Sequence, residues 1–66
     1  MHRSVIEDYL GRRVKVGTLN WEEVGTLTKT SRRGVYFFKS ETGRREELNQ
    51  YQIRQLEQQP RKEQRQ

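Results

Sequence analysis

The sequence predicts a mainly β fold: a small, five-stranded, strongly bent antiparallel barrel with a short N-terminal helix. Residues 23–38 contain two β-prone runs joined by Ser31-Arg-Arg-Gly34, which is typical of a hairpin with a glycine-containing turn. Gly25 interrupts the first run, at the kind of position where a barrel strand must bend. Because one hairpin alone is marginally stable in water, the flanking segments must cover it.

The chain has 66 residues, which is near the size where one core gives only a few kcal/mol of net stability. We expect a single domain at 1–57, followed by a polar, basic and disordered tail at 58–66. The absence of cysteine excludes disulfides and thiolate metal sites. No apolar run approaches the roughly 18 residues of a membrane span, and no signal-peptide core is present. The expected location is therefore cytoplasmic, without a membrane partner.

The first element expected is a helix at 4–10. Ser4 and Glu7 have the spacing of a capping box, in which each side chain accepts from the other residue's backbone N–H. Gly11 is placed to end the helix in a left-handed conformation. The apolar face, which should pack over one end of the barrel, consists of Val5, Ile6, Tyr9 and Leu10.

The strands are expected at about 12–18, 22–30, 34–40, 44–48 and 53–57. Alternation in the first strand directs Val14 and Val16 inward. The third strand is apolar on both faces, because Val35 and Phe37 alternate with Tyr36 and Phe38. One face can fill the barrel, and the other must lie under the helix or against a neighbouring subunit. The fourth strand contributes mainly Leu48 to the interior, which indicates a position near an edge.

The positive charge is concentrated in one part of the chain. The net charge is +5, and basic and acidic residues balance outside 25–45. Within that segment only Glu41 opposes the basic residues, which are Lys29, Arg32, Arg33, Lys39, Arg44 and Arg45. A basic patch formed by adjoining turns is typical of phosphate contact. The alternative is that turns simply tolerate charged residues.

Three aromatic residues have two interpretations each. Tyr51, in an expected one-turn connector, can stack on a base or belong to the core. Trp21 beside a turn is either a stacking platform or a lid over a small core, and Tyr36 has the same ambiguity.

Enzymatic chemistry finds no support in the sequence. The carboxylates occur as adjacent pairs, Glu22-Glu23 and Glu46-Glu47, whose members point to opposite faces of a strand and cannot converge on one substrate. Glycine-rich phosphate loops and metal-ligand spacings are missing. We therefore expect no catalytic residues, no cofactor and no metal site.

The order of elements over residues 5 to about 57 resembles the Sm-like proteins, including the Hfq-type RNA chaperones. The resemblance is carried by the helix, the first strand Val14-Lys-Val16, the Gly25-Thr-Leu27 step in a bent strand, the apolar third strand, and a connector before Ile53. It implies binding of RNA or single-stranded DNA and assembly into a cyclic homo-oligomer. Tyr51 stands where the Hfq-type connector carries a histidine, so that family's uridine recognition does not transfer intact.

A second resemblance concerns the segment from Gly43-Arg-Arg-Glu-Glu-Leu48 to Ile53. It is similar to the closing strands of the small Rho-inhibitor proteins, which use a related barrel to bind a protein. Src-homology-3-like barrels share the same strand plan. This resemblance implies an interaction module that docks an acidic protein partner, and the sequence leaves both functions open.

Overall fold

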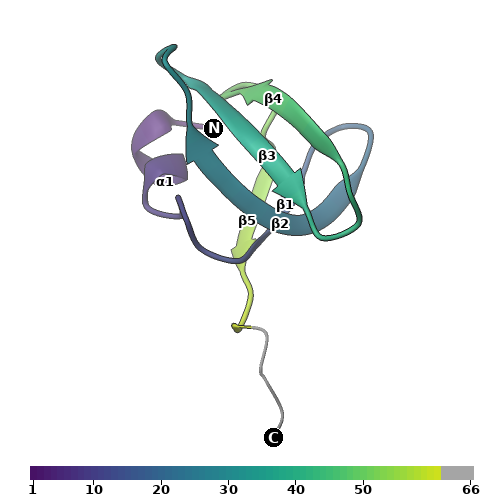
Figure 1. Cartoon of the computed structure of the whole chain (residues 1–66). Helices are drawn as coiled ribbons and strands as arrows, with labels where there is room; N and C mark the ends of the chain where they lie inside the picture. The colour runs from purple at the N-terminus through teal and green to yellow at the C-terminus, as the bar shows by residue number, and fades with distance from the viewer. Residues whose placement is uncertain (62–66) are drawn as a thin grey trace, which may run out of the picture.

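The computed structural model describes residues 1–61 and contains one helix and five strands. The elements are α1 (Arg3–Glu7), β1 (Val14–Gly17), β2 (Glu22–Lys29), β3 (Val35–Ser40), β4 (Arg45–Asn49) and β5 (Gln55–Gln58). All strand pairs are antiparallel, and the sheet order is β4-β3-β2-β1-β5 (Figure 1). The mainly β prediction with a short N-terminal helix is confirmed. Within the described chain β4 and β5 are not paired, so the sheet is not closed and the predicted barrel is not confirmed.

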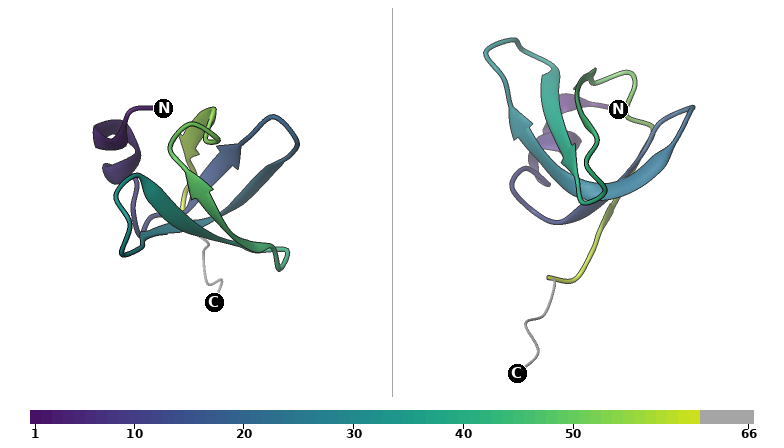
Figure 2. Two further views of the ribbon diagram at one scale, coloured as in Figure 1. Left: turned by 90° about the horizontal axis from the view of Figure 1, so that it is seen from above. Right: turned by 45° about the vertical axis from the view of Figure 1, so that its right-hand side comes forward.

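Gly25 is the residue at which β2 changes partner. It lies opposite Val14 in β1 and also opposite Ser40 in β3. The half of β2 before Gly25 pairs with β1, and the half after it pairs with β3. A Cβ atom at Gly25 would lie 2.2 Å from the Lys39 carbonyl oxygen, so only glycine permits this backbone approach. The strongly curved β2 ribbon in Figure 2 follows from this arrangement.

The core lies on the concave side of the bent sheet. Along β3, Tyr36 and Phe38 are buried, whereas Val35 and Phe37 point to the outer face and are half-buried. The fully buried apolar side chains are Ile6, Val14, Val16, Leu27, Tyr36, Phe38, Leu48 and Ile53. Tyr36 is therefore a core residue. Its hydroxyl donates to Glu7 Oε2 at 2.9 Å, which ties α1 to the sheet.

The helix begins earlier than the capping box predicted. His2 is the N-cap, and its Nδ1 accepts from the Ser4 backbone N–H at 3.0 Å. Because Glu7 binds Tyr36 instead of reaching back to Ser4, the capping-box prediction was wrong. Val5, expected in the core, is 44% exposed, while Ile6 is buried. Gly11 adopts the predicted left-handed conformation, with a φ of 76°, but it does not end the helix, because α1 stops at Glu7 with Asp8 as its C-cap, short of the expected 4–10.

The C-terminal strand starts and ends later than expected. Ile53 is buried ahead of β5, which begins at Gln55. Beyond β5, the Gln59 N–H donates to the Arg13 carbonyl at 2.8 Å, and the Arg13 guanidinium donates to the Pro60 carbonyl at 2.9 Å. The chain thus keeps contact with β1 as far as Pro60, past the expected domain end at 57. The rest of the expected tail, 62–66, lies outside the described residues.

The helix α1 has five residues. Among residues 1–61, no helix has the length and apolar character needed to cross a membrane.

Candidate nucleic-acid interface

The turn between β2 and β3 brings three predicted site residues together. Thr30 Oγ1 accepts from the Arg32 N–H at 3.1 Å and donates to the Val35 carbonyl at 2.8 Å, which closes the turn. Gly34 adopts a φ of 75°, which a glycine tolerates without strain. Lys29, Arg32 and Arg33 therefore project from one exposed hairpin tip.

Beside this tip lies a hollow of about 330 Å³, which we call the basic hollow. Its charged lining residues are Arg3, Lys29, Arg32, Arg33 and Glu7. None of these four cations forms an ion pair within residues 1–61. The Glu7 carboxylate already accepts from the buried Tyr36 hydroxyl, and burial together with this hydrogen bond raises the pKa of Tyr36. The basic hollow is therefore strongly electropositive.

Lys39 and Arg45 form a separate pair on the outer face of the sheet. They are opposite each other in the β3–β4 register, and both are exposed. Neither has a carboxylate partner in the described part of the chain. Two exposed cations side by side can extend a phosphate-binding surface, but they do not line the basic hollow.

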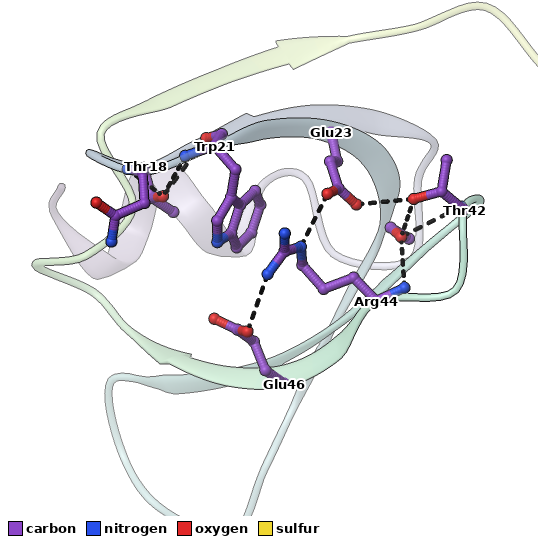
Figure 3. A network of polar contacts seen from close by, with 8 residues as sticks. Thr18, Trp21, Glu23, Thr42, Arg44 and Glu46 are labelled. Carbon is purple, nitrogen blue, oxygen red and sulfur yellow. Dashed lines mark hydrogen bonds and ion pairs between the residues drawn. The ribbon is translucent and has the colours of Figure 1, made fainter.

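Arg44 has a different environment from the other predicted site residues (Figure 3). Its Nε donates to Glu23 Oε2 at 2.9 Å and its Nη1 to Glu46 Oε1 at 3.3 Å. The hydrogen bond to Arg44 is the main cause that lowers the pKa of the Glu23 carboxyl, and the same contact raises the pKa of Arg44. Arg44 thus joins β2 to β4, two strands that are not neighbours in the sheet, and its charge is already compensated.

Trp21 packs against the bridge that Arg44 forms between Glu23 and Glu46. Its ring stacks on Phe38 with a centroid distance of 5.4 Å and an interplanar angle of 16°. The Arg44 guanidinium carbon lies 4.2 Å from the Trp21 ring centroid, in cation–π geometry. These contacts favour the lid interpretation of Trp21 over a free stacking platform.

A second hollow, of about 190 Å³, lies between the β1–β2 loop and the β4–β5 connector; we call it the aromatic hollow. Its apolar lining residues are Leu19, Trp21, Leu48 and Tyr51, and its polar ones include Asn20, Glu46, Gln52 and Arg54. Tyr51 is 76% exposed and Leu19 is 79% exposed. Tyr51 is therefore a surface aromatic residue rather than a core residue.

The connector that carries Tyr51 is fixed by a side-chain cap. Asn49 Oδ1 accepts from the backbone N–H groups of Tyr51, at 2.9 Å, and Gln52, at 3.0 Å. The Gln52 side chain in turn accepts from the Asn49 N–H at 2.8 Å. These bonds make the tight turn expected for this segment and hold the Tyr51 backbone in place.

The connector lies between the two hollows. The Gln50 N–H donates to the Gly34 carbonyl at 2.8 Å, so the connector touches the hairpin tip on one side while Tyr51 and Gln52 line the aromatic hollow on the other. The views in Figures 1 and 2 place the hairpin tip, the N-terminus and the connector at one end of the molecule, away from the end of β5.

Several residues of these hollows were not predicted from the sequence. Arg3 was missed because the charges of residues 1–24 balance, although the fold separates Arg3 from most of those acids. Leu19, Asn20 and Arg54 lie in loops, and only the tertiary arrangement brings them next to Tyr51. No group of His, Asp or Glu side chains that could hold a metal ion occurs among residues 1–61.

No protein-family model matches the chain, and no match was found among curated proteins or among solved structures.

Proposed function

We propose that the protein binds single-stranded nucleic acid, RNA or single-stranded DNA, across the end of the molecule formed by the hairpin tip and the connector. One observation carries this proposal: four cations without carboxylate partners surround the basic hollow, and an exposed tyrosine stands on the adjoining connector. A positive groove beside an aromatic platform is the combination that single-strand binding requires.

The cationic and aromatic residues have different roles in this proposal. Lys29, Arg32 and Arg33 contact phosphates at the hairpin tip, and Tyr51 stacks on a base. A single strand fits this role better than a duplex, because an exposed ring can stack only on a base that is not already stacked in a helix. Lys39 and Arg45 extend the positive surface on the outer face. Arg44, predicted as a phosphate ligand, serves instead to hold β2 against β4.

The electrostatic part is tested by salt dependence. We expect a labelled unstructured oligonucleotide to bind with a log–log salt slope of about −0.7 for each phosphate neutralised on a single strand. Arg32→Ala combined with Arg33→Ala should flatten this slope by about 1.4 if each arginine neutralises one phosphate. The matched control is Lys15→Ala with Arg61→Ala, which changes the net charge equally but away from both hollows. Its slope should stay near that of the wild type.

The stacking part is tested at Tyr51. Tyr51→Ala should weaken binding by about 1–3 kcal/mol with the salt slope unchanged, whereas Tyr51→Phe should retain most of the affinity. Because Tyr51 is 76% exposed, both variants should keep the wild-type circular dichroism spectrum.

The same tests separate nucleic acid from an acidic protein partner. If the wild type binds no oligonucleotide at low salt, where the electrostatic attraction is strongest, the proposed function is wrong. The unpaired cations would then be assigned to docking of an acidic protein, as the Rho-inhibitor resemblance implies.

We also propose that the protein forms a cyclic homo-oligomer in the cytoplasm. In the described chain β4 and β5 each have one unpaired edge, and such edges invite pairing between subunits. Joining β4 of one subunit to β5 of the next would continue the sheet around a ring. Size-exclusion chromatography with light scattering tests this: a strictly monomeric species at tens of micromolar would refute it.

A further inference from the structure

We infer that the aromatic hollow holds a single nucleobase and selects bases with an exocyclic amino group over uracil and thymine. The inference rests on the proposed function. It goes beyond that function by assigning a base preference to side chains that the electrostatic argument does not use.

The size and lining of the hollow fit one planar ring. Its volume of about 190 Å³ is below the roughly 300 Å³ at which pockets for larger ligands begin. Tyr51 and Leu19 offer exposed apolar surface, and Leu48 forms buried lining. A base entering here would gain stacking and apolar contact, while its edge would meet polar side chains.

Glu46 supplies the selective contact. Its Oε1 accepts from Arg44 at 3.3 Å, and its side chain is 40% exposed. Its Oε2 makes no hydrogen bond within residues 1–61. An ionised carboxylate only accepts hydrogen bonds. It therefore favours a base edge with an amino donor, as on cytosine, adenine or guanine. It disfavours uracil and thymine, whose single N3–H donor lies between two carbonyl oxygens that the carboxylate repels.

Three further polar side chains of the lining bear on the argument. Within the described chain the Asn20 amide and the Arg54 guanidinium make no hydrogen bond or ion pair. Gln52 uses its Oε1 on Asn49, which leaves its amide nitrogen available as a donor. Arg54 can neutralise a phosphate next to the bound base, so the charge of Glu46 need not repel the strand. Donors, an acceptor and a cation thus surround one aromatic ring.

The test compares homopolymeric oligonucleotides of A, C and U, equal in length and at one salt concentration. We expect the wild type to bind the A and C oligonucleotides about five- to tenfold more tightly than U. Glu46→Gln should bring the affinities close together. Glu47→Gln is the matched control, because it changes the net charge identically but lies on the opposite, outer face of β4. It should keep the wild-type preference.

A second measurement needs no variant. Trp21, the single tryptophan, lines the aromatic hollow, so its fluorescence should change when the C oligonucleotide saturates the protein. Equal affinity for A, C and U with unchanged Trp21 emission would overturn the base site while leaving the proposed function intact. A preference that survives in folded Glu46→Gln would overturn the role of Glu46. Absence of binding to all three oligonucleotides would instead refute the proposed function itself.

Discussion

Gly25 offers the sharpest test of the bent sheet, through the substitution Gly25→Ala. The added Cβ would lie 2.2 Å from the Lys39 carbonyl oxygen and 2.6 Å from the Ser40 Cα. Both are backbone atoms of β3, so no side chain can rotate away to make room. Overpacking usually costs about 1–3 kcal/mol, and contacts with a backbone place this substitution at or beyond the upper end of that range.

A loss of about 3 kcal/mol is large for this chain. Domains have roughly 0.05–0.15 kcal/mol of stability per residue, which for 66 residues is about 3–10 kcal/mol in total. Each kcal/mol shifts Tm by about 4–8 °C in a domain of this size, so Gly25→Ala should lower Tm by at least about 12 °C or prevent folding.

The matched control is Gly43→Ala. Gly43 has a φ of 105°, and an added Cβ there meets nothing within 4 Å, so the substitution costs only backbone strain of about 1–2 kcal/mol. Thermal and urea denaturation followed by circular dichroism measure both variants. If Gly25→Ala melts within a few degrees of the wild type, or above Gly43→Ala, then β2 does not pass through a close backbone contact at this residue.

Three further predictions concern single contacts. The Arg44 hydrogen bond lowers the pKa of Glu23 in the folded protein. The pair therefore makes its full contribution to folding stability above the ordinary carboxyl pKa of about 4.3, and this contribution is lost as the pH falls through the lowered pKa of the folded state. Wild-type Tm should therefore drop more steeply in acid than that of Arg44→Met, and equal profiles would argue against the bridge. His2→Ala should lower the free energy of unfolding by up to about 1 kcal/mol, because it removes the acceptor of the Ser4 N–H. Ser4→Ala should cost less, because that N–H keeps its acceptor. If urea titrations give the reverse order, Ser4 and not His2 caps the helix. Tyr36→Phe removes one hydrogen bond to α1 and should cost about 1 kcal/mol, whereas unchanged Tm would show that the bond contributes nothing net.

The fold was predictable where it depends on local pattern. The alternation along β1 and β3, the turn at Gly34 and the bend at Gly25 each follow from backbone requirements that a few neighbouring residues express. The helix start was not predictable in this way. Ser4 matched a capping motif, but the competing acceptor, the His2 ring, and the competing partner for Glu7, the Tyr36 hydroxyl, appear only in the folded chain.

The positive charge of the candidate site was predictable from the sequence, but the contacts that its residues make were not. The excess of cations between 25 and 45 does mark the hairpin tip. The closeness of Arg44 to Glu46 was partly predictable, because alternation from an inward Leu48 places residue 46 of β4, and residue 44 just before β4, on the same inner side. Its partner Glu23 was not predictable, since the two approach only because β2 bends.

The capped connector has a thermodynamic consequence for recognition. The backbone of residues 49–52 is already held by the Asn49 side chain and by the Gly34 carbonyl before any ligand arrives. On the protein side, the proposed binding would therefore restrict little more than the two side-chain torsions of Tyr51, a small entropic penalty for a large aromatic surface. The protein backbone at this end should be nearly superimposable between the free and the oligonucleotide-bound states, and affinity should depend on residence time at Tyr51 more than on the rate of encounter.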